Sequence, residues 1–90
     1  MVQVLFPPHL KRHYPAAATC EVEGVTVKDV ILELERRFPG LTSYLVHENG
    51  ALRQHVQIFL DEKFIEDRSG LADSLRGVKQ LFVMQALSGG

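Results

Sequence analysis

Residues 26–40 read TVKDVILELERRFPG and carry the clearest helical pattern of the chain. Thr26 can accept a hydrogen bond from a free N–H of the first turn, and the side chain of Asp29 can accept one from the backbone N–H of Thr26, which completes a capping box. Pro39-Gly40 then stops the helix. The pattern predicts a helix over residues 27–38. Its apolar stripe, with spacings of three and four, consists of Val27, Val30, Ile31, Leu34 and Phe38.

The segments on both sides of this helix alternate between apolar and polar residues, as strands do. Val2, Val4 and Phe6 share one face of the first predicted strand. Residues 9–15 are predicted to form a polar turn anchored by Leu10, and residues 41–53 a long connection. The predicted strands cover residues 2–6, 17–23, 56–60, 64–65 and 79–85.

One helical stripe must cover one apolar face of a sheet, so the order predicts a two-layer α+β domain. The chain has 90 residues and a formal net charge of −1, which implies neither nucleic acid nor a membrane surface as a partner. No window is apolar enough to span a bilayer, and Pro7-Pro8 interrupts any signal-peptide pattern. The single Cys20 cannot form an internal disulfide, which favours a cytoplasmic location.

The C-terminal residues are Ser88-Gly89-Gly90, directly after the apolar run of residues 81–84. Glycine has no Cβ, so a Gly-Gly thread can pass close to the walls of another protein's active site. The simpler interpretation is a disordered chain end. The rest of the sequence favours the first interpretation.

The element order and its motifs resemble the ubiquitin-like β-grasp fold, and more narrowly the bacterial and archaeal sulfur carrier proteins. These include the thiamine-pathway carrier, the small subunit of molybdopterin synthase and, most similar here, the carrier of cysteine biosynthesis. The resemblance implies a mixed sheet of four to five strands packed on one main helix, with a domain over residues 1–84 and a flexible tail over 85–90. The motifs are Val4-Leu5-Phe6-Pro7 and residues 26–30, 34–41, 56–60, 70–75 and 86–90.

In that family an activating enzyme uses ATP to adenylate the terminal carboxylate, and a sulfur donor converts it to a thiocarboxylate. The resemblance therefore implies that Gly90 carries sulfur to an acceptor such as a cysteine synthase, with no catalytic residue and no bound cofactor in the carrier. Two places differ from the family pattern: residues 76–80 replace an acidic turn, and Gln85 replaces a proline. The tail that would enter the active site is Gln85, Ala86, Leu87, Ser88 and Gly89.

An exposed patch is expected on the sheet face away from the helix, formed by Phe59, Phe82 and Met84. An apolar patch of this kind usually marks a partner site, where aromatic residues and methionine are favoured. The alternative is that residues 41–53 bury one or more of these side chains.

Other groups of residues give only weak signals of a metal, catalytic or phosphate-binding site. His9 and His13 would face one metal ion if helical, but the flanking prolines and the lack of nearby acidic or Cys ligands argue against a metal site. Cys20 is expected to be a small buried hydrophobe rather than a nucleophile. Glu33 and Glu35 are expected on a solvated helix face, and no phosphate-binding loop is present.

Three functions stay open at this point. The first is a sulfur carrier that serves cysteine or a related thio-metabolite, with molybdopterin synthase a less favoured destination. The second is a protein modifier that joins Gly90 to lysine amines through an isopeptide bond. The third is an interaction domain in which the Gly-Gly ending has no role.

Overall fold

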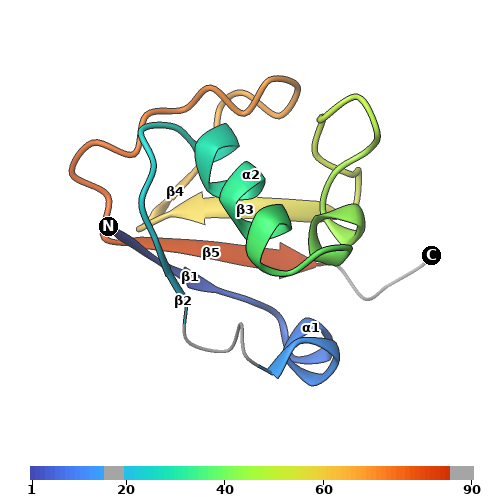
Figure 1. The fold of residues 1–90 in the computed structure, drawn as a ribbon. Helices are drawn as coiled ribbons and strands as arrows, with labels where there is room; N and C mark the ends of the chain where they lie inside the picture. Colours follow the sequence, from blue (N-terminus) through green and yellow to red (C-terminus); the bar gives the residue numbers. More distant parts are fainter. Residues whose placement is uncertain (16–19, 86–90) are drawn as a thin grey trace.

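The computed structural model describes residues 1–15 and 20–85, and it contains one five-stranded mixed sheet (Figure 1). The strands lie in the order β2-β1-β5-β3-β4. β1 pairs with β5 in parallel, and the other neighbours are antiparallel. The elements are β1 (Val2–Leu5), α1 (Pro8–His13), β2 (Cys20–Val22), α2 (Val27–Arg37), a 3-10 turn (Leu41–Tyr44), β3 (Val56–Leu60), β4 (Lys63–Phe64) and β5 (Gln80–Gln85).

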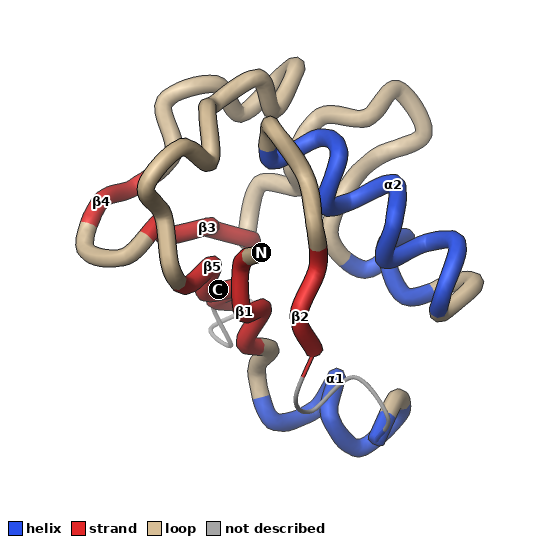
Figure 2. The backbone as a smooth tube through the Cα atoms, turned by 60° about the vertical axis from the view of Figure 1, so that its left-hand side comes forward, coloured by secondary structure: helices blue, strands red, loops and turns tan. Residues whose placement is uncertain are grey.

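The core lies between α2 and one face of the sheet, as the predicted two-layer arrangement requires. In Figure 2 the strands lie to one side of α2, while α1 lies at the bottom, away from it. Side chains alternate along each strand, so every second residue faces the helix. The fully buried side chains on the two layers include Val4, Val22, Val27, Val30, Leu34, Val56, Ile58 and Leu81.

The start of α2 is the predicted capping box. The backbone N–H of Asp29 donates to the Thr26 hydroxyl at 3.3 Å, and the N–H of Thr26 donates to the Asp29 carboxylate at 3.1 Å. The N–H of Val25 also donates to that carboxylate. The backbone bonds from Thr26 and Val25 hold the pKa of Asp29 below its usual range. The helix ends at Arg37, one residue earlier than predicted.

The prediction of a polar turn over residues 9–15 was wrong, because the chain forms the helix α1 there. Pro8 occupies the first turn, where a missing N–H costs nothing and the fixed φ suits a helix. Leu10 is buried, as predicted, and anchors α1 to the core. The second strand is described from Cys20 onward, so its predicted start at residues 17–19 lies outside the described residues.

No helix in the described part of the chain is long and apolar enough to cross a membrane.

Candidate partner-binding face and tail root

An apolar row crosses the sheet on the face away from α2. Leu5 pairs with Phe82, Phe82 pairs with Phe59, and Phe59 pairs with Phe64. Paired residues on neighbouring strands point to the same face, so these four side chains form one line across β1, β5, β3 and β4. Met84 lies on the same face, two residues along β5 from Phe82. We call these five residues the outer apolar row.

The outer apolar row is most accessible at Phe64 and Met84, which are 58% and 51% exposed. Phe59 and Phe82 are half-buried, and the rings of Phe59 and Phe64 lie 4.3 Å apart between centroids. The three residues expected from the sequence therefore lie on one face. The loop of residues 41–53 does not bury Met84, and its leucines Leu41, Leu45 and Leu52 belong to the core cluster.

Leu5 and Phe64 were missing from the expected patch. The alternation of Val4 and Phe6 already places Leu5 on the opposite face, so the signal for Leu5 was present in the sequence. Phe64 depends on the register of the β3–β4 hairpin, in which Leu60 pairs with Lys63 across a two-residue turn. Asp61 has φ of 56° in that turn, a conformation that Asp tolerates better than most residues.

Arg68 lies beside one end of the outer apolar row. Its guanidinium donates to the side-chain oxygen of Gln57 at 3.1 Å and to the backbone oxygen of Arg53 at 2.8 Å. A shallow hollow of about 380 Å³ lies here, and its lining includes Phe59, Phe64 and Arg68. These bonds fix a cationic group where the apolar surface ends.

The tail begins directly after Gln85, which the structure places in β5, paired with Val56. Gln85 was expected to be the first tail residue; its ladder pairing makes it part of the folded domain. The other tail residues, Ala86, Leu87, Ser88, Gly89 and Gly90, lie outside the described residues. We call Gln85, the last residue before the tail, the tail root.

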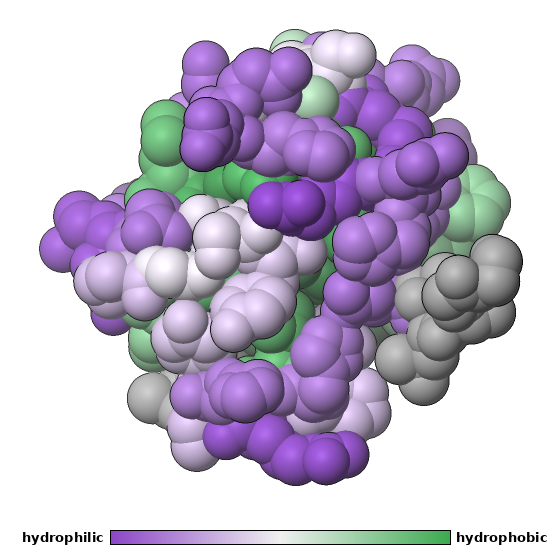
Figure 3. Space-filling view, turned by 90° about the vertical axis from the view of Figure 1, so that its right-hand side faces the viewer, coloured by the Kyte–Doolittle hydropathy of each residue, from purple (hydrophilic) through white to green (hydrophobic). Residues whose placement is uncertain are grey.

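The tail root is surrounded by polar and aromatic side chains from separate segments. Ser43, Tyr44, Arg53 and His55 line a hollow beside Gln85. Arg53 donates from Nε to the backbone oxygen of Ser43 at 2.8 Å, which fixes its position. Figure 3 looks onto this end of the molecule and shows mainly hydrophilic side chains around a paler centre.

α1 is attached to the same end of the molecule through aromatic contacts. The ring of His13 stacks on Tyr44 with centroids 6.2 Å apart, and Tyr14 meets Tyr44 edge-on at 6.5 Å. Sequence reasoning missed this contact, because it assigned residues 9–15 to a turn. The two histidines of α1 do lie four apart on a helix, yet the described residues contain no group of three side chains that could hold a metal ion.

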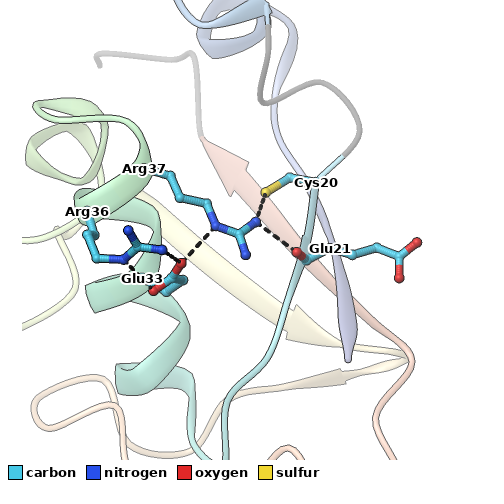
Figure 4. A network of polar contacts seen from close by, with 5 residues as sticks. All are labelled: Cys20, Glu21, Glu33, Arg36 and Arg37. Carbon is cyan, nitrogen blue, oxygen red and sulfur yellow. Dashed lines mark hydrogen bonds and ion pairs between the residues drawn. The ribbon is translucent and has the colours of Figure 1, made fainter.

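A separate polar network joins α2 to β2 (Figure 4). Arg37 donates to Glu33 at 2.8 Å and to the backbone oxygen of Glu21 at 2.9 Å, and its guanidinium lies 3.7 Å from the sulfur of Cys20. Cys20 is buried, as expected. Hydrogen bonds from Arg36 and then Arg37 lower the pKa of Glu33 to about 2.

Glu35 also has a structural role, which corrects the expectation that both carboxylates are merely solvated. It accepts hydrogen bonds from the Thr42 hydroxyl and from the backbone N–H of Gly40, the latter at 2.9 Å. The Thr42 hydroxyl is the main cause that holds the pKa of Glu35 below its usual range. Glu33 and Glu35 therefore connect separate segments through hydrogen bonds and do not form an acid/base pair.

These features have counterparts in known proteins. A model of the ThiS family matches residues 9–90, so the chain belongs to the ThiS family. It is a ThiS-like sulfur carrier protein, and carriers of this family are not enzymes themselves. The predicted sulfur-carrier resemblance is confirmed at this level.

Individual relatives cover almost the whole chain. Sulfur carrier protein CysO of Mycobacterium tuberculosis is 25% identical over 91 residues, covering 99% of this chain and 98% of its own length. A chain in the crystal structure of the Amycolatopsis orientalis BexX/CysO complex is 26% identical, with a TM-score of 0.85 and 100% coverage of both chains. SAMP1 from Haloferax volcanii has a TM-score of 0.69 at 22% identity, covering 99% of this chain and 98% of its own, and supports the fold alone. The predicted β-grasp fold is confirmed.

Proposed function

We propose that Gly90 is the sulfur-carrying residue and that its carboxylate is activated by a separate adenylating enzyme. The carboxylate attacks the α-phosphorus of ATP, and pyrophosphate leaves. Hydrosulfide then attacks the acyl carbon, AMP leaves, and one proton is released with the thiocarboxylate. A persulfide donor needs one further step, in which a second thiol reduces the S–S bond. The observation that carries this proposal is a Gly-Gly ending, the fourth and fifth residues after β5, in a ThiS-family chain.

The fold supports delivery of this terminus into a cleft. β5 is paired with β1 up to Phe82 and with β3 up to Gln85. The five residues beyond it span about 17 Å when fully extended. The domain can therefore stay outside the partner while Gly90 reaches the reacting atoms.

We assign recognition of the activating enzyme to the outer apolar row. A line of aromatic and aliphatic side chains on an exposed sheet face is typical of a protein interface. Phe64 and Met84 are its most exposed members and are the expected contact residues. Burial of such side chains in a well-packed interface contributes a large share of binding free energy.

The acceptor that we favour is an enzyme of cysteine biosynthesis or of a related thio-metabolite, in the cytoplasm. The support is the full-length likeness to CysO at 25% identity. Conjugation to lysine amines is the second candidate, because it needs the same activated carboxylate and SAMP1 shares the fold. Transfer within a molybdopterin synthase is less favoured.

The decisive experiment is intact mass spectrometry of the chain after incubation with the adenylating enzyme of its own organism, ATP and sulfide. We expect one sulfur in place of one oxygen, localised to Gly90. A variant lacking Gly89 and Gly90 is expected to stay unmodified and to melt at the same temperature as the wild type. Conjugates of higher mass through Gly90 would instead identify a modifier, and an unmodified wild type beside an active enzyme would reject both.

The recognition surface is tested separately by Phe64→Ser combined with Met84→Ser. We expect the KM of the activating enzyme for the carrier to rise about tenfold, equivalent to about 1.4 kcal/mol. Leu32→Ser is the matched control, because Leu32 is 60% exposed and lies on α2, on the other side of the sheet. Equal KM values for the wild type and the double variant would show that the enzyme binds elsewhere.

A further inference from the structure

The end of the molecule that carries the tail root also carries a set of cationic side chains from segments far apart in sequence. β1 runs parallel to β5, so α1, which follows β1, lies at the end of the sheet where β5 finishes (Figure 1). α1 contributes Lys11 and Arg12, both exposed. Arg53 and Arg68 lie beside Gln85 and Met84 at the same end. We call Lys11, Arg12, Arg53 and Arg68 the basic collar.

The basic collar is not neutralised within the described residues. Both ion pairs found there involve Glu33, with Arg36 and Arg37, and none involves a collar residue. Arg53 and Arg68 are instead held by backbone oxygens and an amide oxygen, which position a guanidinium without cancelling its charge. Positively charged groups that are already ordered lose little side-chain entropy when they bind a partner.

Asp61, Glu66 and Asp73 lie at the opposite end of the sheet, together with Lys63 and Arg76. Asp61 follows the end of β3, and its carboxylate accepts from the backbone N–H of Lys79 and Gln80, where β5 begins. Asp73 accepts from the N–H groups of Glu66 and Asp67 in the same region. The chain is close to neutral as a whole, with a net charge of −1, while the four collar residues are all positive.

Asp67, next to Arg68 in sequence, accepts hydrogen bonds from the backbone N–H groups of Gly70 and Ala72. The carboxylates of Glu33 and Glu35 on α2 are also engaged. Glu33 binds Arg36 and Arg37, and Glu35 binds Thr42 and the backbone of Gly40. Neither carboxylate forms an ion pair with a collar residue in the described part of the chain. The collar therefore presents its charge to solvent or to a partner.

We propose that the basic collar docks onto an acidic rim around the entrance of the activating enzyme's active site. This inference rests on the proposed function, in which the tail enters that site. The positive charge around the tail root orients the carrier during diffusion, so that the tail leads. The same charges hold the tail root at the entrance while the outer apolar row supplies the apolar contact. A nucleic acid would also attract cations, but a near-neutral chain with so few collar residues is a poor match for a phosphate backbone.

The test compares two double charge reversals in the adenylation reaction, measured as ATP–pyrophosphate exchange with the adenylating enzyme of the same organism. Lys11→Glu with Arg12→Glu changes the basic collar. Lys28→Glu with Arg76→Glu makes the same change in net charge at exposed positions outside the collar. At low ionic strength we expect the collar variant to raise KM for the carrier at least tenfold with kcat unchanged, and the control to stay within about twofold, since steering acts on encounter. The difference is expected to shrink at high salt, where charges are screened.

Two further measurements make the result decisive. The first uses two variants: Lys11→Gln combined with Arg12→Gln, and Arg53→Gln alone. Both remove charge without adding repulsion, so we expect smaller rises in KM, with unchanged circular dichroism. If the wild type is activated and all collar variants match it, the collar proposal is wrong while the carrier function stands; if the wild type is not activated, the function itself fails. Binding of a 20-nucleotide DNA probe that is lost in the collar variant, with unchanged enzyme kinetics, would also overturn the proposal.

Discussion

At the scale of single residues, glycine is needed at Gly50 for its positive φ alone, and at Gly40 for positive φ and for the space that a Cβ would fill. Both have positive φ, 94° and 90°, a conformation that other residues adopt at a cost. A Cβ on Gly50 would meet nothing within 4 Å, whereas a Cβ on Gly40 would lie 3.1 Å from the hydroxyl of Tyr14. Gly40 therefore begins the 3-10 turn that follows α2 and also makes room for the segment that follows α1.

We expect Gly40→Ala to destabilise the fold by about 2 kcal/mol and Gly50→Ala by about 1 kcal/mol, because both pay for positive φ and Gly40 also crowds Tyr14. Urea unfolding followed by circular dichroism measures both values. The variant Gly40→Ala combined with Tyr14→Phe removes the crowded hydroxyl and should recover part of the loss. Equal losses at the two positions would show that the Tyr14 contact has no energetic weight.

At the scale of elements, α2 is connected to β2 through the Glu33–Arg37 network. Glu33 binds the guanidinium that reaches the backbone of Glu21, so one carboxylate orders the link between the helix and a strand. Its pKa of about 2 lies below the unperturbed 4.5, because Arg36 and Arg37 favour the charged form. A folded-state pKa below the unfolded value stabilises the fold above about pH 4.5, and this contribution is lost as the pH falls through about 2.

We therefore expect Glu33→Gln to lower the melting temperature modestly at pH 7, with a difference from the wild type that shrinks as the pH falls from about 4.5 to about 2. The effect is small because water still reaches the ion pairs: the side chains of Glu33, Arg36 and Arg37 are 25%, 72% and 35% exposed. Thermal unfolding across this pH range checks it. Glu48→Gln is the control, because Glu48 forms no ion pair among the described residues. A difference that stays constant with pH would assign the effect to packing instead.

Elements whose signals are local can be predicted from the sequence alone, and those that depend on distant pairing cannot. α2 was predicted to within one residue because its signals are local: a capping box, a stripe and a Pro-Gly stop. α1 was missed because Leu10 is its one buried residue, so the segment shows no apolar stripe. Phe64 was missed because its place in the outer apolar row depends on pairing with Phe59, which no local pattern contains. The basic collar needs the parallel β1–β5 pairing, a contact between the two ends of the chain.

At the scale of the whole molecule, a single core joins every described element except β4, whose two residues are exposed. α2 supplies its buried stripe to a sheet whose inner face is equally buried, so no part of the core can be lost without affecting the rest. A domain of 90 residues has a small net stability, of roughly 5–15 kcal/mol. A single buried leucine is then a large part of the total.

We expect Leu34→Ala to cost about 3 kcal/mol, because the side chain is fully buried between helix and sheet. Leu32→Ala, two residues away and 60% exposed, should cost less than about 0.5 kcal/mol. Urea unfolding at one wavelength for helix and one for aromatic packing should give coincident transitions for both variants. Separate transitions would mean that α2 can detach while the sheet persists.

The position of β5 has a consequence for biosynthesis. This strand lies at the centre of the sheet, between β1 and β3, yet it is the last of the described strands to leave the ribosome. Until it emerges, the nascent chain holds two separate two-stranded ribbons, β1–β2 and β3–β4, and an isolated ribbon of this kind is marginally stable in water. Folding therefore waits until Gln85 has left the ribosome, and a messenger cut short before that codon yields a chain that proteases can remove.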